Sequence, residues 1–421
     1  MSAGNRETLE SVTAEITQTS LMRVRRPHEH HRVTYVELLF DLVFAFAVTQ
    51  ISHTLLGDPT ALGLARTTVL FLAVWWVWIY TSWITNWLDP DRFAVRIMLF
   101  ALMLGGLVLA SSIPKAFDSR GIAFAVAYTA MQVGRSIFMF YAVPATESRL
   151  RINFARIVVY LLISGVFWIL GALSEGQARL DWWIAALAVE YVSPYTNFWV
   201  PGLGASTVKD WTVEGGHMAE RCASFILIAL GESIVVTGGA FAGLSWTHAN
   251  IGAFASAFVG SLAMWWIYFH KGAEASAVNI TSVADPGRIA RLAYTYLHMP
   301  IVAGIIVGAV GDDLALMHPD GHNDLKTVLS LVGGPLLFLV GTILFKQTIH
   351  GWYQLSHLVG IVVLLPMLYF GDLVSPLMLS AATTAVLVVV GVWEAISLGA
   401  QATLRRKELV RAQRMDGKHS L

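Results

Sequence analysis

The sequence predicts an all-α integral membrane protein of about twelve transmembrane helices, arranged as two parallel six-helix repeats. Three observations lead to this fold class. Apolar residues make up 56% of the 421 residues and charged residues only 13%, with a mean hydropathy of +0.62, whereas soluble domains carry about 25% charged residues. Apolar runs long enough to cross a bilayer recur along nearly the whole chain, and the positive charges concentrate in alternate gaps between these runs.

The twelve apolar runs are the predicted helices. A bilayer core about 30 Å thick requires about 20 residues of helix. The runs are too long and too continuously apolar for the strands of a membrane β-barrel, which are about 10 residues long and alternate in polarity. The predicted spans of the first half are 35–56, 62–87, 93–113, 121–143, 157–173 and 182–200, and those of the second half are 218–241, 251–270, 292–310, 328–345, 355–370 and 376–398.

The distribution of Lys and Arg predicts the orientation, because cytoplasmic loops carry the positive excess. With the amino terminus inside, 22 of the 28 basic residues fall on or near the cytoplasmic side and five on or near the outside, and Arg135 is the only one that lies well inside a span. We therefore expect a multi-pass protein of the cell (inner) membrane with both termini in the cytoplasm.

The predicted boundaries divide the chain into five segments. Residues 1–34 are a polar cytoplasmic segment, 35–200 the first six-helix repeat, 201–217 a cytoplasmic linker, 218–398 the second repeat and 399–421 a basic cytoplasmic tail. No apolar run close to Met1 marks a cleavable signal peptide, so the first helix is expected to direct insertion.

Five pairs of matching residues, in the same order in both halves, predict an internal repeat. Because each half has an even number of helices, both would enter the membrane in the same direction, with a pseudo-twofold axis along the membrane normal and a pathway between the repeats. Shared packing solutions are the alternative explanation. The pairs are Glu37 with Glu220, Trp75 and Trp76 with Trp265 and Trp266, Asp89 and Pro90 with Asp285 and Pro286, Gly134 and Arg135 with Gly341 and Thr342, and Glu190 with Glu394.

Composition also argues against several function classes. The formal net charge is zero, which disfavours nucleic acid as a partner. The single cysteine, Cys222, leaves no intramolecular disulfide and no Cys-rich metal site. No phosphate-binding loop, zinc-protease motif or serine nucleophile elbow is present, so we predict no catalytic residues, no metal and no cofactor.

Ionisable residues inside the apolar runs are the predicted site, because a charge in hydrocarbon costs roughly 2.5 kcal/mol or more and marks function by default. In the first predicted helix, Glu37 and Asp41 stand four residues apart on one face, about 6 Å along the axis. Gln50 and His53 continue the polar content toward the far end. His53 could equally be an interfacial residue.

The seventh predicted helix carries the second set of candidates. His217, Glu220 and Arg221 lie at its cytoplasmic end, and Glu232 and Ser233 lie near the bilayer midplane. Glu220 and Glu232 are 12 residues apart, or about 18 Å along a helix. We take Glu232 as the charge least readily explained by packing.

Arg135 in the fourth predicted helix requires compensation, because an unpaired guanidinium in the membrane would be costly. We expect a carboxylate beside it, either Asp41 or Glu232; a pair that serves only fold specificity is the alternative. Glu190 and Glu394 lie toward span ends, where snorkelling is easier.

The string from Glu37 to Gln50, ELLFDLVFAFAVTQ, followed by His53, resembles the signature of the bacterial low temperature requirement A family. Three further motifs strengthen the resemblance: Trp75 with Trp76, residues 217–221 (HMAER) and residues 230–233 (LGES). It covers residues 35–398 and implies a multi-pass inner-membrane protein without an established chemical activity. The chain is also faintly similar to potassium channels that carry a Phe-Ser-Asp motif, but it has no serine between Phe40 and Asp41.

These observations favour transport of a small solute or ion, such as a proton or a monovalent cation, with Asp41 and Glu232 exchanging protons or cations and Arg135 balancing their charge. An ion channel, an intramembrane enzyme acting on a lipid-type substrate, and a non-catalytic stress-adaptation factor are the alternatives. The expected partners are the lipid bilayer and the transported solute, and assembly as a homo-oligomer stays open.

Overall fold

A computed structural model describes residues 20–23, 32–207, 214–270 and 286–416. Within these residues every regular element is a helix, apart from two isolated bridges that pair Met22 with Leu88 and Val200 with Gly204. The all-helical class is therefore confirmed. The helices are α2 (Tyr35–Gly57), α3 (Ala61–Trp87), α4 (Phe93–Ser112), α5 (Gly121–Ala142), α6 (Ser148–Leu173), α7 (Gly176–Val192), α8 (Gly215–Ala242), α9 (His248–Phe269), α11 (Pro286–Ala290), the π-helical η3 (Arg291–Tyr296), α12 (His298–Met317), α13 (Leu325–His350), α14 (Leu355–Phe370) and α15 (Pro376–Asp416). Short 3₁₀ turns, η1 (Ile113–Lys115) and η4 (Gly371–Leu373), follow α4 and α14.

Eleven helices of the described chain are long and apolar enough to cross a membrane. Helix α7, with 17 residues, is not among them, so the prediction of about twelve spans is confirmed for eleven. The predicted sixth span, 182–200, is wrong in its bounds. Pro194 has no N–H to continue the helix, and the hydroxyl of Ser193 instead donates to the Glu190 carbonyl at 2.8 Å. Positive φ angles at Asn197 and Phe198 then turn the chain.

The predicted ninth span, 292–310, also differs from the structure. Residues 291–296 form a π-helical turn, and the α-helix proper runs from His298 to Met317. Pro300 lacks the N–H that would bond to the carbonyl four residues earlier, at Tyr296. The wider turn before α12 therefore lies where regular α-helical bonding is interrupted.

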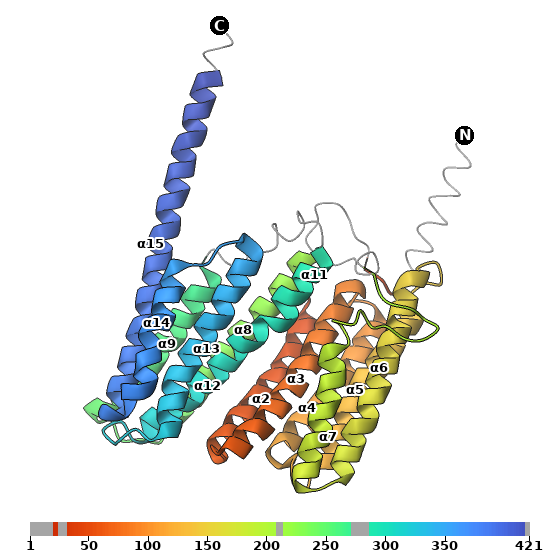
Figure 1. Cartoon of the computed structure of the whole chain (residues 1–421), viewed down its shortest axis with the longest axis horizontal. Coiled ribbons are helices and arrows are strands. Elements are labelled where there is room, and N and C mark those ends of the chain that lie inside the picture. Colours follow the sequence, from red (N-terminus) through yellow and green to blue (C-terminus); the bar gives the residue numbers. More distant parts are fainter. Residues whose placement is uncertain (1–19, 24–31, 208–213, 271–285, 417–421) are drawn as a thin grey trace. The chain divides into compact units, whose positions relative to one another are not determined.

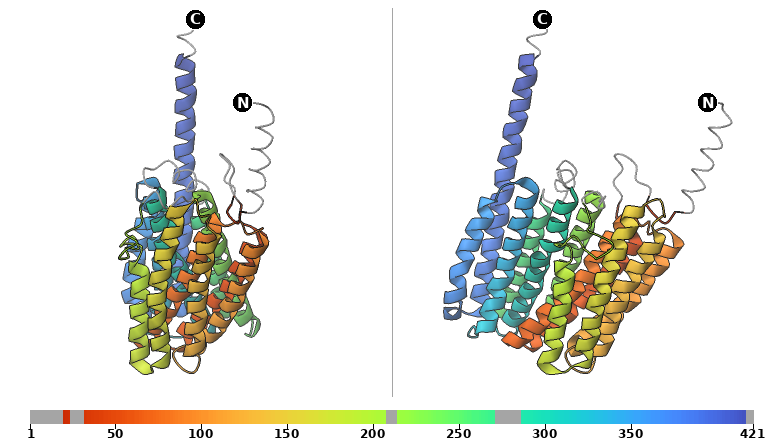
Figure 2. Two further views of the ribbon diagram at one scale, coloured as in Figure 1. Left: turned by 90° about the vertical axis from the view of Figure 1, so that its right-hand side faces the viewer. Right: turned by 45° about the vertical axis from the view of Figure 1, so that its right-hand side comes forward.

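The chain divides into two compact units. Unit 1 contains residues 1–232 and 274–299, and unit 2 contains residues 233–273 and 300–421. The divisions fall inside α8 and inside α12. Helices α2 to α7 run side by side in unit 1 (Figures 1 and 2).

Tryptophans of α3 form the core of unit 1. Trp75, Trp76 and Trp78 are at most 2% exposed, so they pack inside the protein rather than in an interfacial belt. The Trp76 ring stacks on Tyr191 with a centroid distance of 4.0 Å. The Trp75 indole N–H donates to the carbonyl of Thr295 at 2.8 Å, which anchors the π-helical turn against α3.

In unit 2, glycines bring α12 and α13 close together. A Cβ on Gly334 would lie 2.5 Å from the backbone nitrogen of Gly308, and a Cβ on Gly304 would lie 2.5 Å from that of Phe338. Small residues that allow such backbone approach are the usual means of helix association in membranes. The sequence pair Gly304 and Gly308 is thus a packing motif.

Unit 2 also contains a buried ion pair that the sequence analysis did not anticipate. Lys346 lies within α13 at 3% exposure, and its Nζ donates to both oxygens of Glu394, at 2.6 and 2.8 Å. Nζ also donates to the carbonyl of Ile267 at 2.9 Å. Glu394 is therefore held by a counter-charge inside the unit and does not snorkel.

Gly334→Ala should lower the apparent melting temperature of the detergent-solubilised protein, because the added methyl group meets the α12 backbone and overpacking costs about 1–3 kcal/mol. The neighbouring Gly333 provides the control, since no atom lies within 4 Å of a Cβ built there. Gly333→Ala should leave the melting temperature unchanged or raise it slightly, because Ala favours helix over Gly. Equal effects of the two substitutions would contradict the proposed close approach.

Candidate functional site

Glu37 lies in the first turn of α2, at the end of unit 1 where α8 begins. Its Oε2 accepts hydrogen bonds from the backbone N–H and the hydroxyl of Thr34, both at 2.9 Å. A glutamate at the third helical position that bonds back to the residue before the helix is one half of a capping box. Glu37 therefore has a structural role in starting α2, although its side chain is fully buried.

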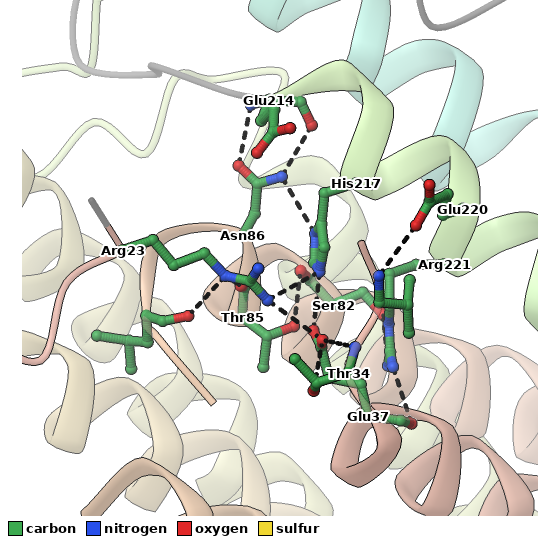
Figure 3. Close-up of polar contacts among 12 residues, drawn as sticks. Arg23, Thr34, Glu37, Ser82, Thr85, Asn86, Glu214, His217, Glu220 and Arg221 are labelled. Atoms are coloured by element: carbon green, nitrogen blue, oxygen red, sulfur yellow. Dashed lines mark hydrogen bonds and ion pairs between the residues drawn. The ribbon is translucent and has the colours of Figure 1, made fainter. Parts of the chain in front are cut away.

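His217 of α8 binds the other oxygen of Glu37 (Figure 3). Asn86 Oδ1 accepts the backbone N–H of Glu214 at 3.0 Å, so Asn86 Nδ2 is the end that faces His217 Nδ1 at 3.3 Å. His217 Nε2 lies 2.8 Å from Glu37 Oε1 and 3.2 Å from Arg23 Nη2. The imidazole therefore links Glu37, Arg23 and Asn86 in one network.

Arg23 closes this end of the network. Its Nε donates to the carbonyls of Thr85 and Leu88, at 2.8 and 3.0 Å, and its Nη2 donates to Glu37 Oε2 at 3.2 Å. The flanking bridge between Met22 and Leu88 holds the short segment 20–23 against α3. A residue outside the predicted spans thus supplies the counter-charge for Glu37.

One helical turn deeper, Asp41 of α2 pairs with Arg221 of α8. Asp41 Oδ1 lies 2.8 Å from Arg221 Nη2 and accepts the indole N–H of Trp78 at 2.7 Å. All three side chains are fully buried. Burying two charges in a low-dielectric interior carries a large desolvation penalty, which only close pairing and further hydrogen bonds offset.

Arg221 satisfies its remaining donors on both neighbouring helices. Its Nη1 donates to the Glu37 carbonyl at 2.9 Å, and its Nε and Nη2 donate to the hydroxyl of Ser82 at 3.3 and 3.2 Å. The guanidinium also lies over the rings of Phe40 and Trp78, 5.8 and 5.7 Å from their centroids. The geometry therefore fixes Arg221 in one orientation.

Asp41 Oδ2 is different from every other oxygen of these carboxylates. It is buried and has no hydrogen-bond partner in the described part of the chain. Such unsatisfied groups are rare in folded proteins, and each requires an explanation. Asp41 thus offers one acceptor that a proton, a water molecule or a cation could use.

Glu232 and Thr49 link the same two helices farther along. The Thr49 hydroxyl donates to Glu232 Oε1 in a short hydrogen bond, and Glu232 is half-buried. We refer to the three links, Glu37 with His217, Asp41 with Arg221 and Thr49 with Glu232, as the α2–α8 seam. Because all three pairs advance in the same order on both helices, α2 and α8 run parallel along it.

The other predicted site residues lie beside the seam or apart from it. Glu220 is exposed and accepts the backbone N–H of Val33 at 2.9 Å. Gln50 is half-buried, and its carbonyl accepts the Thr54 hydroxyl at 2.7 Å. His53 is exposed at the far end of α2, and Ser233 is 6% exposed at the first position of unit 2.

The expected partners of Arg135 were wrong. Neither Asp41 nor Glu232 binds it. Its Nη1 donates to the Val77 carbonyl at 2.9 Å and to the Thr81 hydroxyl at 2.8 Å, and its Nη2 donates to the Gln132 side chain. Neutral oxygens, rather than a carboxylate, therefore accept the hydrogen bonds that the two Nη atoms donate.

Glu190 is likewise buried, at 1% exposure, and does not snorkel to an interface. Its two oxygens accept hydrogen bonds from four neutral side chains. These are Tyr128, Gln132, Ser164 and Trp168. Gln132 bridges it to Arg135 through opposite ends of one amide, so charge is balanced across a single intervening side chain.

Sequence reasoning missed Arg23, Trp78, Ser82 and Asn86. A signal for two of them was present, because Ser82 and Asn86 are polar residues inside an apolar run. Nothing in the sequence signalled Arg23, which lies among other basic residues before the first span. In the described residues no group of three or more His, Cys, Asp and Glu side chains could hold a metal ion.

A double-mutant cycle should show that Asp41 and Arg221 act as a pair. Asp41→Asn or Arg221→Gln alone leaves a buried charge unpaired, which we expect to lower the free energy of unfolding in detergent by about 3–5 kcal/mol. The double variant should recover part of this, with a non-additive contribution of about 0.5–3 kcal/mol. The matched cycle of Arg135→Gln and Glu232→Gln should be additive, because these residues share no partner. Additivity at Asp41 and Arg221 would refute the pairing.

Comparison with known proteins agrees with the motifs of α2, α3 and α8. The family described as bacterial low temperature requirement A protein matches residues 32–392. A protein of Rhizobium meliloti (strain 1021) named "Uncharacterized protein RA0937" is 42% identical over 369 residues, which cover 87% of this chain and 90% of that protein. No solved structure matches the chain. The family match spans all the residues of the α2–α8 seam, and the chain belongs to the bacterial low temperature requirement A family.

Proposed function

We propose that the chain transports a small solute or ion across the inner membrane, with both termini in the cytoplasm, and that the α2–α8 seam exchanges a proton or a monovalent cation. The observation that carries this proposal is the unpartnered Oδ2 of Asp41 beside an otherwise saturated ion pair. A carboxylate whose second oxygen is available can take up and release a cation while Arg221 balances its charge. A carboxylate kept only for packing would be expected to have both oxygens satisfied, as Glu190 has.

The spacing of polar groups on α2 supports a route along the helix. Glu37, Asp41, Thr49 and His53 follow one another at multiples of four residues, so they form a slowly turning stripe on one side. Each step of four residues advances about 6 Å along the axis. Only Ala45 interrupts the stripe, and its small side chain leaves more room than any other apolar residue except glycine.

An apolar segment separates Asp41 from Thr49, over about 12 Å of helix. Ala45 lies midway on α2, and Phe225 lies one turn beyond Arg221 on α8. The Phe225 ring packs on Trp78 with a centroid distance of 4.3 Å. In the proposed function this segment is the barrier that a transport cycle opens and closes.

The internal repeat stays part of the proposal. Two parallel six-helix repeats would pair Glu190 with Glu394, and both are buried. The pair Trp76 and Trp266 differs, with exposures of 0% and 45%. A duplicated origin with diverged environments accommodates both observations.

Asp41→Asn should abolish ion flux, because the amide retains the shape of the side chain but cannot exchange a proton or bind a cation as a charge. Flux is measured in proteoliposomes, for protons with a trapped pH-sensitive dye and for Na⁺ and Rb⁺ with radioactive tracers. We expect a loss of about tenfold or more relative to the wild type, normalised to folded protein. The exposed Glu175, at the start of α7, provides the control, and Glu175→Gln should retain the flux.

Two results would contradict the transport proposal. In one, wild-type vesicles show no flux of any of the three ions above that of protein-free vesicles. In the other, Asp41→Asn is folded and conducts like Glu175→Gln, which would make the Asp41–Arg221 pair a packing element.

A further inference from the structure

A cavity of about 410 Å³ that is lined by both charged and apolar residues opens at the end of α2 opposite Glu37, within unit 1. Its wall combines the last turn of α2, the first turns of α3 and the turn that follows α4. The volume lies in the range of about 300–1,000 Å³ that is typical of small-molecule sites. No residue of the α2–α8 seam lines it, although His53, one turn beyond Thr49, stands at its edge.

Two cations in this cavity have no anionic partner. Arg66 and Lys115 line it, and neither forms an ion pair or a side-chain hydrogen bond within the described residues. Arg66 is held by the ring of Phe117, 5.3 Å from its guanidinium carbon, while its buried Nε donates to nothing in the described chain. A guanidinium fixed on an aromatic face keeps its N–H groups available for an oxyanion.

The other basic residues at this end of unit 1 are accounted for differently. Arg179 donates to five backbone carbonyls, including those of Ala116 and Asp118. Arg120 donates to the Ser111 carbonyl. The two guanidinium groups outside the cavity are thus used by the fold, whereas Arg66 and Lys115 are not.

Two carboxylates line the same cavity. Asp58 and Asp118 lie on the wall, and no ion pair within 4 Å joins either of them to Arg66 or Lys115. Arg66 and Lys115 thus contribute two positive charges to the lining, and Asp58 and Asp118 contribute two negative charges. Such a wall does not favour a lone anion or a lone cation, but it complements a molecule that carries both charges.

Hydrogen bonds hold the rim of the cavity in place at Asp58. Asp58 Oδ1 accepts the hydroxyl of Thr60 at 2.7 Å, and the Thr60 hydroxyl oxygen accepts the backbone N–H of Gly63 at 3.0 Å. A Cβ on Gly63 would lie 2.0 Å from the Asp58 carbonyl oxygen, so only glycine allows this turn to pack on α3. The Asp58 carboxylate is therefore held in place before a ligand binds, and such preorganisation favours binding.

We propose that this cavity binds a small zwitterion that carries an ammonium group and an oxyanion. Arg66 and Lys115 receive the oxyanion, and Asp58 and Asp118 receive the ammonium group. Two sources share this chemistry: a free amino acid, and the phosphoethanolamine headgroup of a lipid at the membrane surface. That the bound molecule is the transported solute rests on the proposed function, whereas the binding itself does not.

Binding can be measured by calorimetry with the detergent-solubilised full chain. The probes are glycine, β-alanine, γ-aminobutyrate and O-phosphoethanolamine, and acetate and methylammonium serve as single-charge controls. We expect at least one zwitterion to bind about tenfold or more tightly than either control. Arg66→Gln should weaken that binding by about tenfold or more, whereas Arg120→Gln, which removes a cation outside the cavity, should leave it unchanged.

Native mass spectrometry of protein extracted with lipid separates the two sources. Retention of phosphatidylethanolamine by the wild type and its loss in Arg66→Gln would assign the headgroup, and binding of a free amino acid would assign the solute. The inference is overturned if no probe binds and no phosphatidylethanolamine is retained, or if Arg66→Gln and Arg120→Gln behave alike. Zwitterion binding without flux of either the ions or the bound zwitterion would keep this inference and reject the transport proposal, and ion flux without zwitterion binding would do the reverse.

Discussion

The Asp41–Arg221 ion pair is the constraint around which this part of the molecule is arranged. Two full charges without water require every strong donor to find an acceptor. Arg221 therefore fixes the distance of α8 from the Glu37 carbonyl on α2 and from the Ser82 hydroxyl on α3. The aromatic rings of Phe40 and Trp78 lie against the guanidinium. Helix α2 cannot rotate or slide against α8 without breaking several of these contacts at once.

Helix α3 makes this arrangement possible because its residues form hydrogen bonds on two sides of the helix. One side gives Trp78, Ser82 and Asn86 to the α2–α8 seam. Another gives the Val77 carbonyl and the Thr81 hydroxyl to Arg135 of α5. A single helix thus accepts hydrogen bonds from both Arg221 and Arg135. Its polar residues are rotated around the helix rather than gathered in one stripe, which explains why no amphipathic pattern marks it in the sequence.

The sequence was sufficient to predict the helical membrane class, most spans and the buried charges, because cost in hydrocarbon depends on residue type and depth. The sequence did not predict which buried side chains contact one another. Which residues meet depends on the rotation of each helix about its axis, and Arg135 could be matched to Asp41 or Glu232 only by depth. The exclusion of neutral partners was the error, since Gln132, Thr81 and a carbonyl supply enough oxygens. The predicted helix bounds were wrong near Pro194 and Pro300, where proline removes a backbone N–H donor.

Glu190 and Asp41 show how the same residue type can be stabilised in opposite ways. Glu190 relies on four neutral donors, which occupy both of its oxygens. Asp41 has a full counter-charge on one oxygen and nothing in the described chain on the other. The hydrogen bonds to Glu190 occupy both oxygens, so this carboxylate has no oxygen left to bind another group. The arrangement at Asp41 balances its charge and leaves a lone pair available on Oδ2. In the proposed function a cation is gained or lost there while the ion pair that holds the helices together stays intact.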